Sequence, residues 1–233
     1  MKKIGLIGGT GPEATVDYYK AIIDSFKDGK GEMNYPEIII YSVSLGKLMG
    51  FMRSGNYESA IAYLSEAIAR LKDAGADFAA ITANTPHIFF DEISGRAGLP
   101  LISIVEAART EAFRRNLKRP GLFGTGFTMD ASFYPDSFRR KGMEVVLPAK
   151  EDRELLHYKL FTEIELGIFR DDTRDLLISI IGKMVQQQQI DSLILGCTEF
   201  PLILADPFYY GIPMLNTTRI HVDALVAYCR ENP

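Results

Sequence analysis

The chain has 233 residues, of which 47% are hydrophobic and 24% charged, and its formal net charge is -4. This length allows one large domain or two small ones, and the composition is typical of globular proteins. No apolar run reaches the roughly 18 residues that a membrane span needs, so no membrane partner is expected. The acidic balance, without a basic cluster, argues against nucleic acid as a partner.

Two cysteines and three histidines limit the chemistry further. Two cysteines in a chain of this size suggest no disulfide framework, and the histidines show no metal-ligand spacing, so no bound metal is expected. The N-terminal MKKIGLIGG has lysines before an apolar run, but glycines interrupt that run and no small-residue cleavage site follows. We therefore expect a cytoplasmic protein without a signal peptide.

In chain order, short apolar runs alternate with longer segments of helical period. The sequence predicts strands at residues 3–8, 37–44, 78–82, 100–104, 120–125, 144–148, 192–196 and 213–216. Pro12 suits the first position of a helix after the first strand. A longer helix, Tyr57 to Asp73, is predicted by apolar residues at helical spacing: Ile61, Leu64, Ala67, Ile68 and Leu71. Apolar strands joined by helices indicate an α/β fold with parallel-rich sheets.

An internal repeat divides the chain. Similar segments recur in the same order, at residues 5 and 121, 77 and 191, and 99 and 212, with offsets of 116, 114 and 113 by subtraction. We predict two similar pseudo-symmetric domains, the first comprising residues 1–98 and 208–233 and the second residues 99–207. Ligands of parallel sheets bind beyond the carboxyl ends of the strands, so the active site is expected in the cleft between the domains.

The repeat pairs ITANTPH, residues 81–87, with ILGCTEF, residues 194–200. Inversion of a carbon stereocentre requires a proton to leave one face and another to arrive at the opposite face, which suits two facing loops. Cys197 follows a strand and precedes a helix, where free backbone N–H groups favour a thiolate. A small buried structural cysteine is the alternative reading of this position.

These residues resemble a known family. The chain is similar to the cofactor-independent aspartate/glutamate racemase superfamily, closest to its aspartate racemase branch, in IGLIGGTGPEAT, NTPH, GLFGTGFTMDASFY, LGCTEFPL and the closing IHVDA. The resemblance implies racemisation of an acidic or related amino acid without pyridoxal phosphate, and commonly a homodimer. It also implies that Cys197 is one of two catalytic acid/bases.

The chain departs from the family pattern in its first half. Where the family has Cys-Asn-Thr, this sequence has Ala83, Asn84 and Thr85, and an alanine methyl group cannot transfer a proton. Three explanations stay open. The alanine is an engineered replacement, or it is natural and Thr82 or water supplies the second proton, or Cys197 acts alone in a one-faced reaction such as that of single-cysteine decarboxylases.

A substrate carboxylate needs fixed hydrogen-bond donors. Side-chain and backbone donors at strand ends, together with the family motifs, identify the candidate substrate-binding residues as Gly9, Thr10, Asn84, Thr85, Thr125, Thr128, Thr198 and Glu199. Any one of the threonines or the asparagine has helix capping as an alternative role. Gly9 and Thr10 belong to a glycine-rich turn before a helix N-terminus, which suits an anion.

A second substrate carboxylate needs a cation. By the resemblance, Arg53 in the segment FMRSGNY, which we expect to be a loop, is the candidate, since a guanidinium binds carboxylates bidentately. Lys47 is the alternative, and no residue of EDRELLHYKLF, Lys159 included, is assigned to this role. The resemblance also makes His221 a candidate site residue that tunes Cys197, with a packed structural histidine as the alternative.

Parts of the sequence also fit two rival functions. Residues 9–14 satisfy the glycine-rich dinucleotide fingerprint, but the next strand ends without the acidic residue that binds a ribose hydroxyl. A catalytically silent amino acid-binding protein is favoured by Ala83 and disfavoured by the intact GCTE around Cys197. Cys229 is distant from every motif and is interpreted as structural. His87 lies one helical turn beyond Ala83 and, like His221, has a packed structural histidine as the alternative reading.

Overall fold

A computed structural model describes residues 1–27 and 33–231. The chain forms two compact units, residues 1–104 with 221–233 and residues 105–220, and each unit is considered separately below. No helix in the described ranges is long and apolar enough to cross a bilayer.

The first unit is built on a parallel sheet of three strands. In the order β2-β1-β3, it contains β1 (Ile4–Gly8), β2 (Ile38–Ser42) and β3 (Phe78–Ile81), and a single bridge joins Leu101 to β3. Its helical segments are α1 (Pro12–Ser25), α2 (Leu45–Arg53), α3 (Tyr57–Asp73), η1 (Thr85–Phe89), α4 (Phe90–Ala97) and most of α11 (Thr217–Arg230). β1 and β3 are fully buried, as central parallel strands are.

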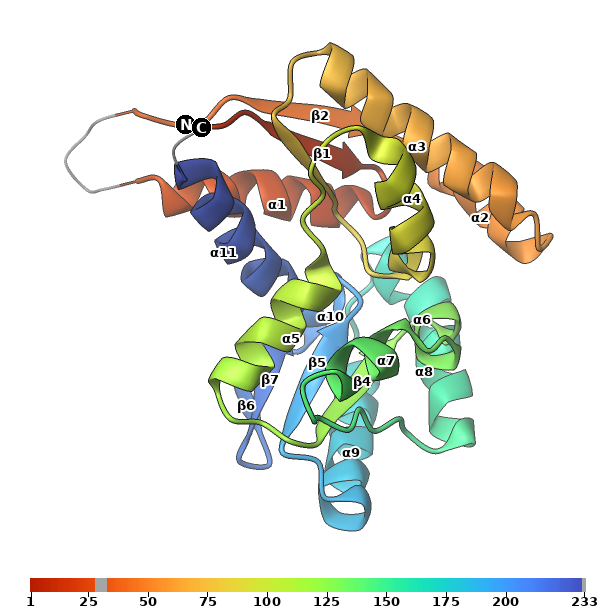
Figure 1. The fold of residues 1–233 in the computed structure, drawn as a ribbon. Helices are drawn as coiled ribbons and strands as arrows, with labels where there is room; N and C mark the ends of the chain where they lie inside the picture. The colour runs from red at the N-terminus through yellow and green to blue at the C-terminus, as the bar shows by residue number, and fades with distance from the viewer. Residues whose placement is uncertain (28–32, 232–233) are drawn as a thin grey trace. The chain divides into compact units, whose positions relative to one another are not determined.

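Helices cover both faces of this sheet. Alternate residues of β1, Ile4 and Leu6, pack with α1 and α11 in one apolar cluster that also contains Cys229. Gly5 points to the opposite face, where α3 passes close enough that a side chain on Gly5 would contact Leu71. Figure 1 shows α1 and α11 running together beside the strands of this unit. The interpretation of Cys229 as a structural residue agrees with this packing.

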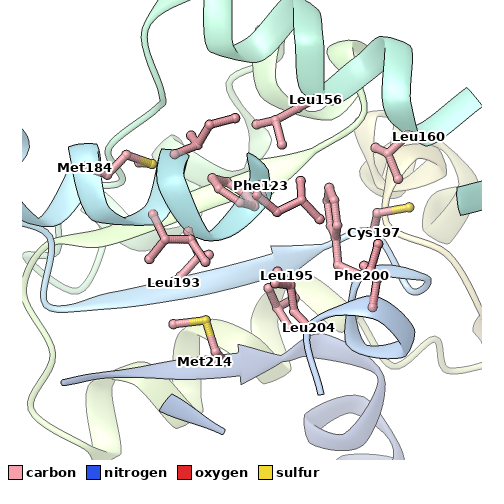
Figure 2. Close-up of a cluster of buried hydrophobic side chains, with 14 of the residues drawn as sticks. Phe123, Leu156, Leu160, Met184, Leu193, Leu195, Cys197, Phe200, Leu204 and Met214 are labelled. Carbon is pink, nitrogen blue, oxygen red and sulfur yellow. The ribbon is translucent and has the colours of Figure 1, made fainter. Parts of the chain in front are cut away.

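The second unit repeats the plan. Its sheet has the order β4-β5-β7-β6 and contains β4 (Pro120–Gly124), β5 (Ser192–Gly196), β7 (Ile212–Asn216) and the short antiparallel β6 (Phe208–Tyr209). Its helical segments are α5 (Ile104–Arg114), α6 (Gly126–Asp130), α7 (Phe133–Arg139), α8 (Lys150–Thr162), η2 (Ile164–Leu166), α9 (Asp171–Gln188) and α10 (Phe200–Ile203). Figure 2 shows its apolar core, in which Phe123 and Leu193 of the sheet meet Leu156 of α8 and Met184 of α9.

The sheets explain the sequence repeat. β1 and β3 pair in parallel in the first unit as β4 and β5 do in the second. On its other side, β3 is bridged to Leu101, and β5 pairs with β7 in the same way. The three repeated segments therefore lie in the same order in both sheets. The α/β class and the predicted helix from Tyr57 to Asp73 are confirmed, as is the start of α1 at Pro12.

Other expectations need correction. The runs 100–104 and 144–148 form only single bridges, at Leu101 and Val146, because few of their residues lie beside a partner strand and α5 already begins at Ile104. Residues 208–220 belong to the second unit, and not to the first as predicted, because β7 pairs with β5. The other boundary lies at residue 104 instead of 98. The two residues of β6 are too few to show a period in the sequence.

Candidate active site

The candidate chemistry of the second unit lies just beyond the end of β5. β5 ends at Gly196, directly opposite Gly124, the last residue of β4, so the loops that follow leave the same edge of the sheet. Cys197 is the first residue after β5 and is only 6% exposed. It packs beside Leu160 and Phe200, as Figure 2 shows. Its thiol therefore has an apolar environment on one side.

Polar groups surround the rest of the thiol. Cys197 Sγ lies 3.0 Å from Glu199 Oε2 and 3.6 Å from Glu165 Oε1. The Thr198 hydroxyl donates to the same Glu199 oxygen over 2.9 Å. Because Glu199 Oε2 accepts from a thiol and a hydroxyl, it has the contacts of an ionised carboxylate. Glu199 and Thr198 are both buried, so this cluster is largely shielded from water.

Burial and charge decide the protonation of the cluster. Burial, followed by the charge of Glu199 and then that of Glu165, raises the pKa of the Cys197 thiol well above its ordinary value. Burial and the negative charge of Glu199 also raise the pKa of Glu165 to about 7, against a hydrogen bond with Cys197 that lowers it. Carboxyls at this separation titrate as a coupled set.

This result corrects the expected thiolate. The backbone beyond Cys197 does lower the pKa of the thiol, but it is the smallest of the contributions. The α10 helix after Glu199 has only four residues, so its dipole is weak beside two carboxylates within 4 Å of the sulfur. Cys197 is therefore a thiol in the resting protein, and it needs a proton acceptor to become a base.

Thr125 and Thr128 lie after β4 and mainly organise their own turn. The Thr125 hydroxyl accepts from the Thr128 backbone N–H over 3.2 Å and caps α6, and the two hydroxyls lie 3.2 Å apart. Thr128 is fully buried and Thr125 is 6% exposed. Capping, the alternative role considered for Thr125, is thus present, and the residue lies at the same sheet edge as Cys197.

In the first unit, the equivalent loop follows β3. The fully buried Thr82 donates its hydroxyl proton to the Ile7 carbonyl of the neighbouring strand over 2.9 Å. Ala83, 7% exposed, occupies the position that Cys197 has in the second unit. Its carbonyl accepts from His87 Nδ1 over 2.9 Å. In this structure the Thr82 hydroxyl is a structural donor, which weakens its candidacy as a second proton source.

Two buried histidines brace this unit. His87 donates from Nδ1 to Ala83, and its Nε2 accepts the Ile104 N–H over 3.3 Å. His221 donates from Nε2 to the Ile102 carbonyl over 2.9 Å, and its Nδ1 accepts the Tyr18 hydroxyl over 2.8 Å. Both nitrogens of each ring are thereby used.

Burial keeps both histidines neutral. It lowers the pKa of His87 to about 3, with help from His221, and the pKa of His221 to about 4. The structure therefore gives His221 the packing role that was the alternative reading, and no ring nitrogen of His221 remains for a substrate.

The glycine-rich turn after β1 prepares the N-terminus of α1. Gly9 has φ of +80°, and a Cβ on it would lie 2.3 Å from the Val43 carbonyl oxygen. Its N–H donates to Thr15 over 3.0 Å and so is not available to a ligand. The hydroxyl of Thr10 is buried and makes no hydrogen bond to the described protein atoms. In this turn, Thr10 is the better candidate for contacting an anion.

The remaining candidates differ in setting. Asn84 is 3% exposed and starts η1, while Thr85 is partly buried in η1. Arg53 was expected in a loop, but it lies in the last turn of α2, where it is exposed. Lys47, also on α2, lies over the Tyr63 ring at 4.4 Å. Lys159 is paired with Glu163 at 2.5 Å, which occupies its ammonium group.

Glu165 is the residue that sequence reasoning missed. It lies in η2, 32 residues before Cys197, and no motif precedes or follows it. Among the described residues, Glu165, Cys197 and Glu199 also bring ligand atoms within 4.8 Å of one another, the spacing of a metal site. Such a site would need the thiolate form of Cys197, whereas burial and both carboxylates favour the thiol.

The two units with parallel sheets and a thiol–carboxylate cluster define an α/β protein with the fold of two-domain racemases. The family model for Asp/Glu/Hydantoin racemases matches residues 7–225, so the chain belongs to the Asp/Glu/hydantoin racemase family. The broad specificity amino-acid racemase RacX of Bacillus subtilis is 23% identical over 218 residues, which cover 92% of each protein.

Solved structures agree. A Yersinia pestis protein described provisionally as an Asp/Glu racemase matches with a TM-score of 0.89 and 33% identity, covering 99% of this chain and 100% of the other. An aspartate racemase homologue from Pyrococcus horikoshii matches with a TM-score of 0.83 and 34% identity, with the same coverage. Both the fold and the family expected from the sequence are therefore confirmed.

Proposed function

We propose that this protein is an isomerase that removes and returns the α-proton of aspartate, glutamate or a related amino acid, with Cys197 as the acid/base. The observation that carries the proposal is a buried thiol, 3.0 Å from a carboxylate, at the end of the central strand β5. The names of the relatives, a broad specificity amino-acid racemase and glutamate racemases, support this substrate class.

The proposed reaction needs a base for the α-proton and hydrogen-bond donors for the substrate carboxylate. The Cys197 thiolate takes the α-proton, and the negative charge that develops on the substrate carboxylate requires nearby donors. We assign the donor role to Thr125 in the second unit and to Thr10, Asn84 and Thr85 in the first unit, whereas the hydroxyl proton of Thr198 is engaged with Glu199. Thiols transfer protons without an organic cofactor, so none is included in the proposal.

Ala83 bears on whether the enzyme inverts its substrate or only exchanges the α-proton. Inversion needs a second proton donor, and the position equivalent to Cys197 in the first unit carries only a methyl group. The Thr82 hydroxyl is already engaged with the Ile7 carbonyl. We therefore propose that α-proton exchange at one face is faster than inversion, with water as the second donor.

Proton NMR in D₂O tests the proposal. The α-proton signals of L- and D-aspartate and of L- and D-glutamate are followed with the wild-type chain, Cys197→Ala and Ala83→Cys. We expect one enantiomer to lose its proton without inverting, no exchange in Cys197→Ala, and racemisation of the exchanged enantiomer in Ala83→Cys. Cys229→Ser is the matched control and should keep the wild-type exchange rate.

The outcomes separate the alternatives. Rapid racemisation by the wild-type chain would contradict the proposed one-faced activity. Absence of exchange with all four substrates, Ala83→Cys included, would contradict the acidic amino acid assignment and favour a single-cysteine decarboxylase or a silent binding protein. A separate variant tests Arg53. If Arg53 binds the distal carboxylate, Arg53→Ala should raise the KM for aspartate.

We further propose, from the family resemblance, a cytoplasmic homodimer. Sedimentation equilibrium of the purified chain distinguishes a dimer from a monomer of 26.0 kDa. A monomer at micromolar concentration would contradict this part of the proposal and leave the chemistry at Cys197 untouched.

A further inference from the structure

Two buried histidines of the first unit take no part in the proposed reaction, yet both bind the chain where it passes between the units. The chain leaves the first unit after Ile104, which we call the first connection, and returns to it at His221, the second connection. His87 accepts the Ile104 N–H, and His221 donates to the carbonyl of the nearby Ile102. Both connections are therefore held, on the side of the first unit, by an imidazole.

The partners decide which ring nitrogen of each histidine carries the proton. The Ala83 carbonyl can only accept, so His87 Nδ1 is the donor and His87 Nε2 accepts the Ile104 N–H. The Ile102 carbonyl likewise fixes the proton of His221 on Nε2, and its Nδ1 accepts a tyrosine hydroxyl. Burial lowers the pKa of both rings and keeps them neutral, so these hydrogen bonds persist at neutral pH.

The hydrogen bond to Ile104 has a specific consequence for α5. Ile104 is the first residue of α5, and the N–H groups in the first turn of a helix have no acceptor within the helix. His87 Nε2 supplies one acceptor over 3.3 Å, from a side chain that is 2% exposed and stacks on Phe90 at 5.1 Å between ring centres. The imidazole is thus firmly placed between the Ala83 carbonyl and the start of α5.

We propose that His87 is a positioning residue that couples the loop bearing Asn84 and Thr85 to the first connection between the units. This inference rests on the proposed function, in which that loop binds substrate. The ring bonds the Ala83 carbonyl, next to Asn84, on one side and Ile104 on the other. A substrate that restricts the motion of the loop therefore also restricts the start of α5, and a looser loop loosens it.

Two substitutions of His87 each break one end of this link. His87→Asn keeps a donor near the position of Nδ1, for the Ala83 carbonyl, but does not reach Ile104. His87→Gln keeps an acceptor near the position of Nε2, for Ile104, but loses the hydrogen bond to Ala83. Amide hydrogen exchange, followed by NMR without substrate, should be about fivefold faster at Ile104 in His87→Asn, the usual effect of one hydrogen bond. In His87→Gln it should be nearly unchanged.

A substitution in the loop tests whether its two ends communicate. Pro86→Ala loosens the backbone between Ala83 and His87, because proline restricts the chain. In the wild-type background, Pro86→Ala should speed amide exchange at Ile104 by about threefold. In the His87→Asn background it should have no further effect at Ile104, because the link is already broken. The same is expected in His87→Gln, which breaks the other end and serves as the test if His87→Asn does not fold.

The second arm adds racemic aspartate in excess. In the wild-type chain, aspartate should slow amide exchange at Ile104 by about threefold or more. Neither His87→Asn nor His87→Gln should show this protection, because in each variant one end of the link is missing. His87→Gln also releases the Ala83 carbonyl, so it should raise the KM for aspartate by about fivefold with kcat little changed. A purely structural histidine would lower stability without removing the response of Ile104 to aspartate.

His157→Leu is the matched control. His157 also accepts a backbone N–H at a helix N-terminus, that of Gly126 at the start of α6 in the second unit. The substitution should speed amide exchange at Gly126 and leave Ile104 unchanged, because His157 does not contact either connection.

The contrary outcomes are distinct. The inference is overturned if Pro86→Ala leaves Ile104 unchanged in the wild-type background, or if it acts equally in the wild-type and His87→Asn backgrounds. It is also overturned if the protection of Ile104 by aspartate survives in both His87 variants. The expected effect of Pro86→Ala, with no response to aspartate in any chain, would support the link and contradict the proposed function for this substrate.

Discussion

The loops after β3 and β5 follow equivalent strands of their sheets and differ in electrostatics. After β5, Cys197, Glu199 and Glu165 converge, and the charge of Glu199 raises the pKa of both Cys197 and Glu165. After β3, Ala83 contacts a neutral histidine, His87, whose low pKa means that it carries no charge near pH 7. An internal repeat can therefore preserve topology while one copy keeps the ionisable chemistry and the other becomes a packing site.

The largest expected effect is on the pH dependence of stability, where the two loops act in opposite directions. The depressed pKa values of His87 and His221, about 3 and about 4, mean that the unfolded chain binds more protons below pH 6.5. The first unit is thus destabilised as the pH falls. The raised pKa of Glu165, about 7, means that the folded chain binds the extra proton between pH 4.5 and 7. The second unit is thus destabilised as the pH rises through that range.

Urea unfolding at several pH values between 4.5 and 6.5 separates the effect of the histidines from that of Glu165. Each fully shifted group changes the free energy of unfolding by up to about 1.4 kcal/mol per pH unit. Glu165→Gln should make the rise of stability with pH steeper, and His87→Gln should make it shallower. Equal slopes in the wild-type chain and both variants would contradict the comparison.

The next largest effect concerns the turn after β1. Gly9→Ala should lower the free energy of unfolding by about 3 kcal/mol, because the new Cβ meets the Val43 carbonyl at 2.3 Å in addition to adopting positive φ. Gly55→Ala is the matched control, since Gly55 has φ of +70° and nothing within 4 Å of the added Cβ. It should cost only about 1 kcal/mol. Equal losses in the two variants would show that the close approach to Val43 is unimportant.

A thiol placed in the first loop makes the comparison direct. The cysteine introduced by Ala83→Cys lies beside neutral His87 instead of two carboxylates, so its thiolate is less disfavoured than that of Cys197. We expect iodoacetamide at pH 8 to alkylate it about tenfold faster than Cys197, which corresponds to about one pKa unit. Mass spectrometry of the two peptides gives both rates in one sample. A slower reaction at the introduced thiol would mean that burial there outweighs the absence of charge.

The smallest effect tests Thr82. Thr82→Val removes its hydrogen bond to the Ile7 carbonyl and should lower the free energy of unfolding by about 1 kcal/mol. If water is the second proton donor, the exchange rate should stay within about twofold of wild type. Thr110→Val, at an exposed helix position, is the control for the loss of a hydroxyl. A large loss of exchange in Thr82→Val alone would restore Thr82 as a proton donor.

Parts of the fold and the site follow from local signals in the sequence. The helix from Tyr57 to Asp73 is visible in the sequence as apolar residues at helical spacing. Four strands are visible as short apolar runs, which end at Gly8, Ile81, Gly124 and Gly196. The same is true of Cys197 within GCTE and of the substitution at Ala83, which a repeat of nearly constant offset aligns with Cys197. Those features the sequence determines by itself.

The tertiary structure alone decided the rest. Glu165 meets Cys197 across 32 residues, and no periodicity or motif records that contact. The protonation of the thiol, the neutrality of His221 and the engagement of Thr82 all depend on burial and on partners brought from other elements. A pKa reflects the surroundings of a group in three dimensions, so a motif names the reactive atom, whereas packing sets whether that atom carries its proton.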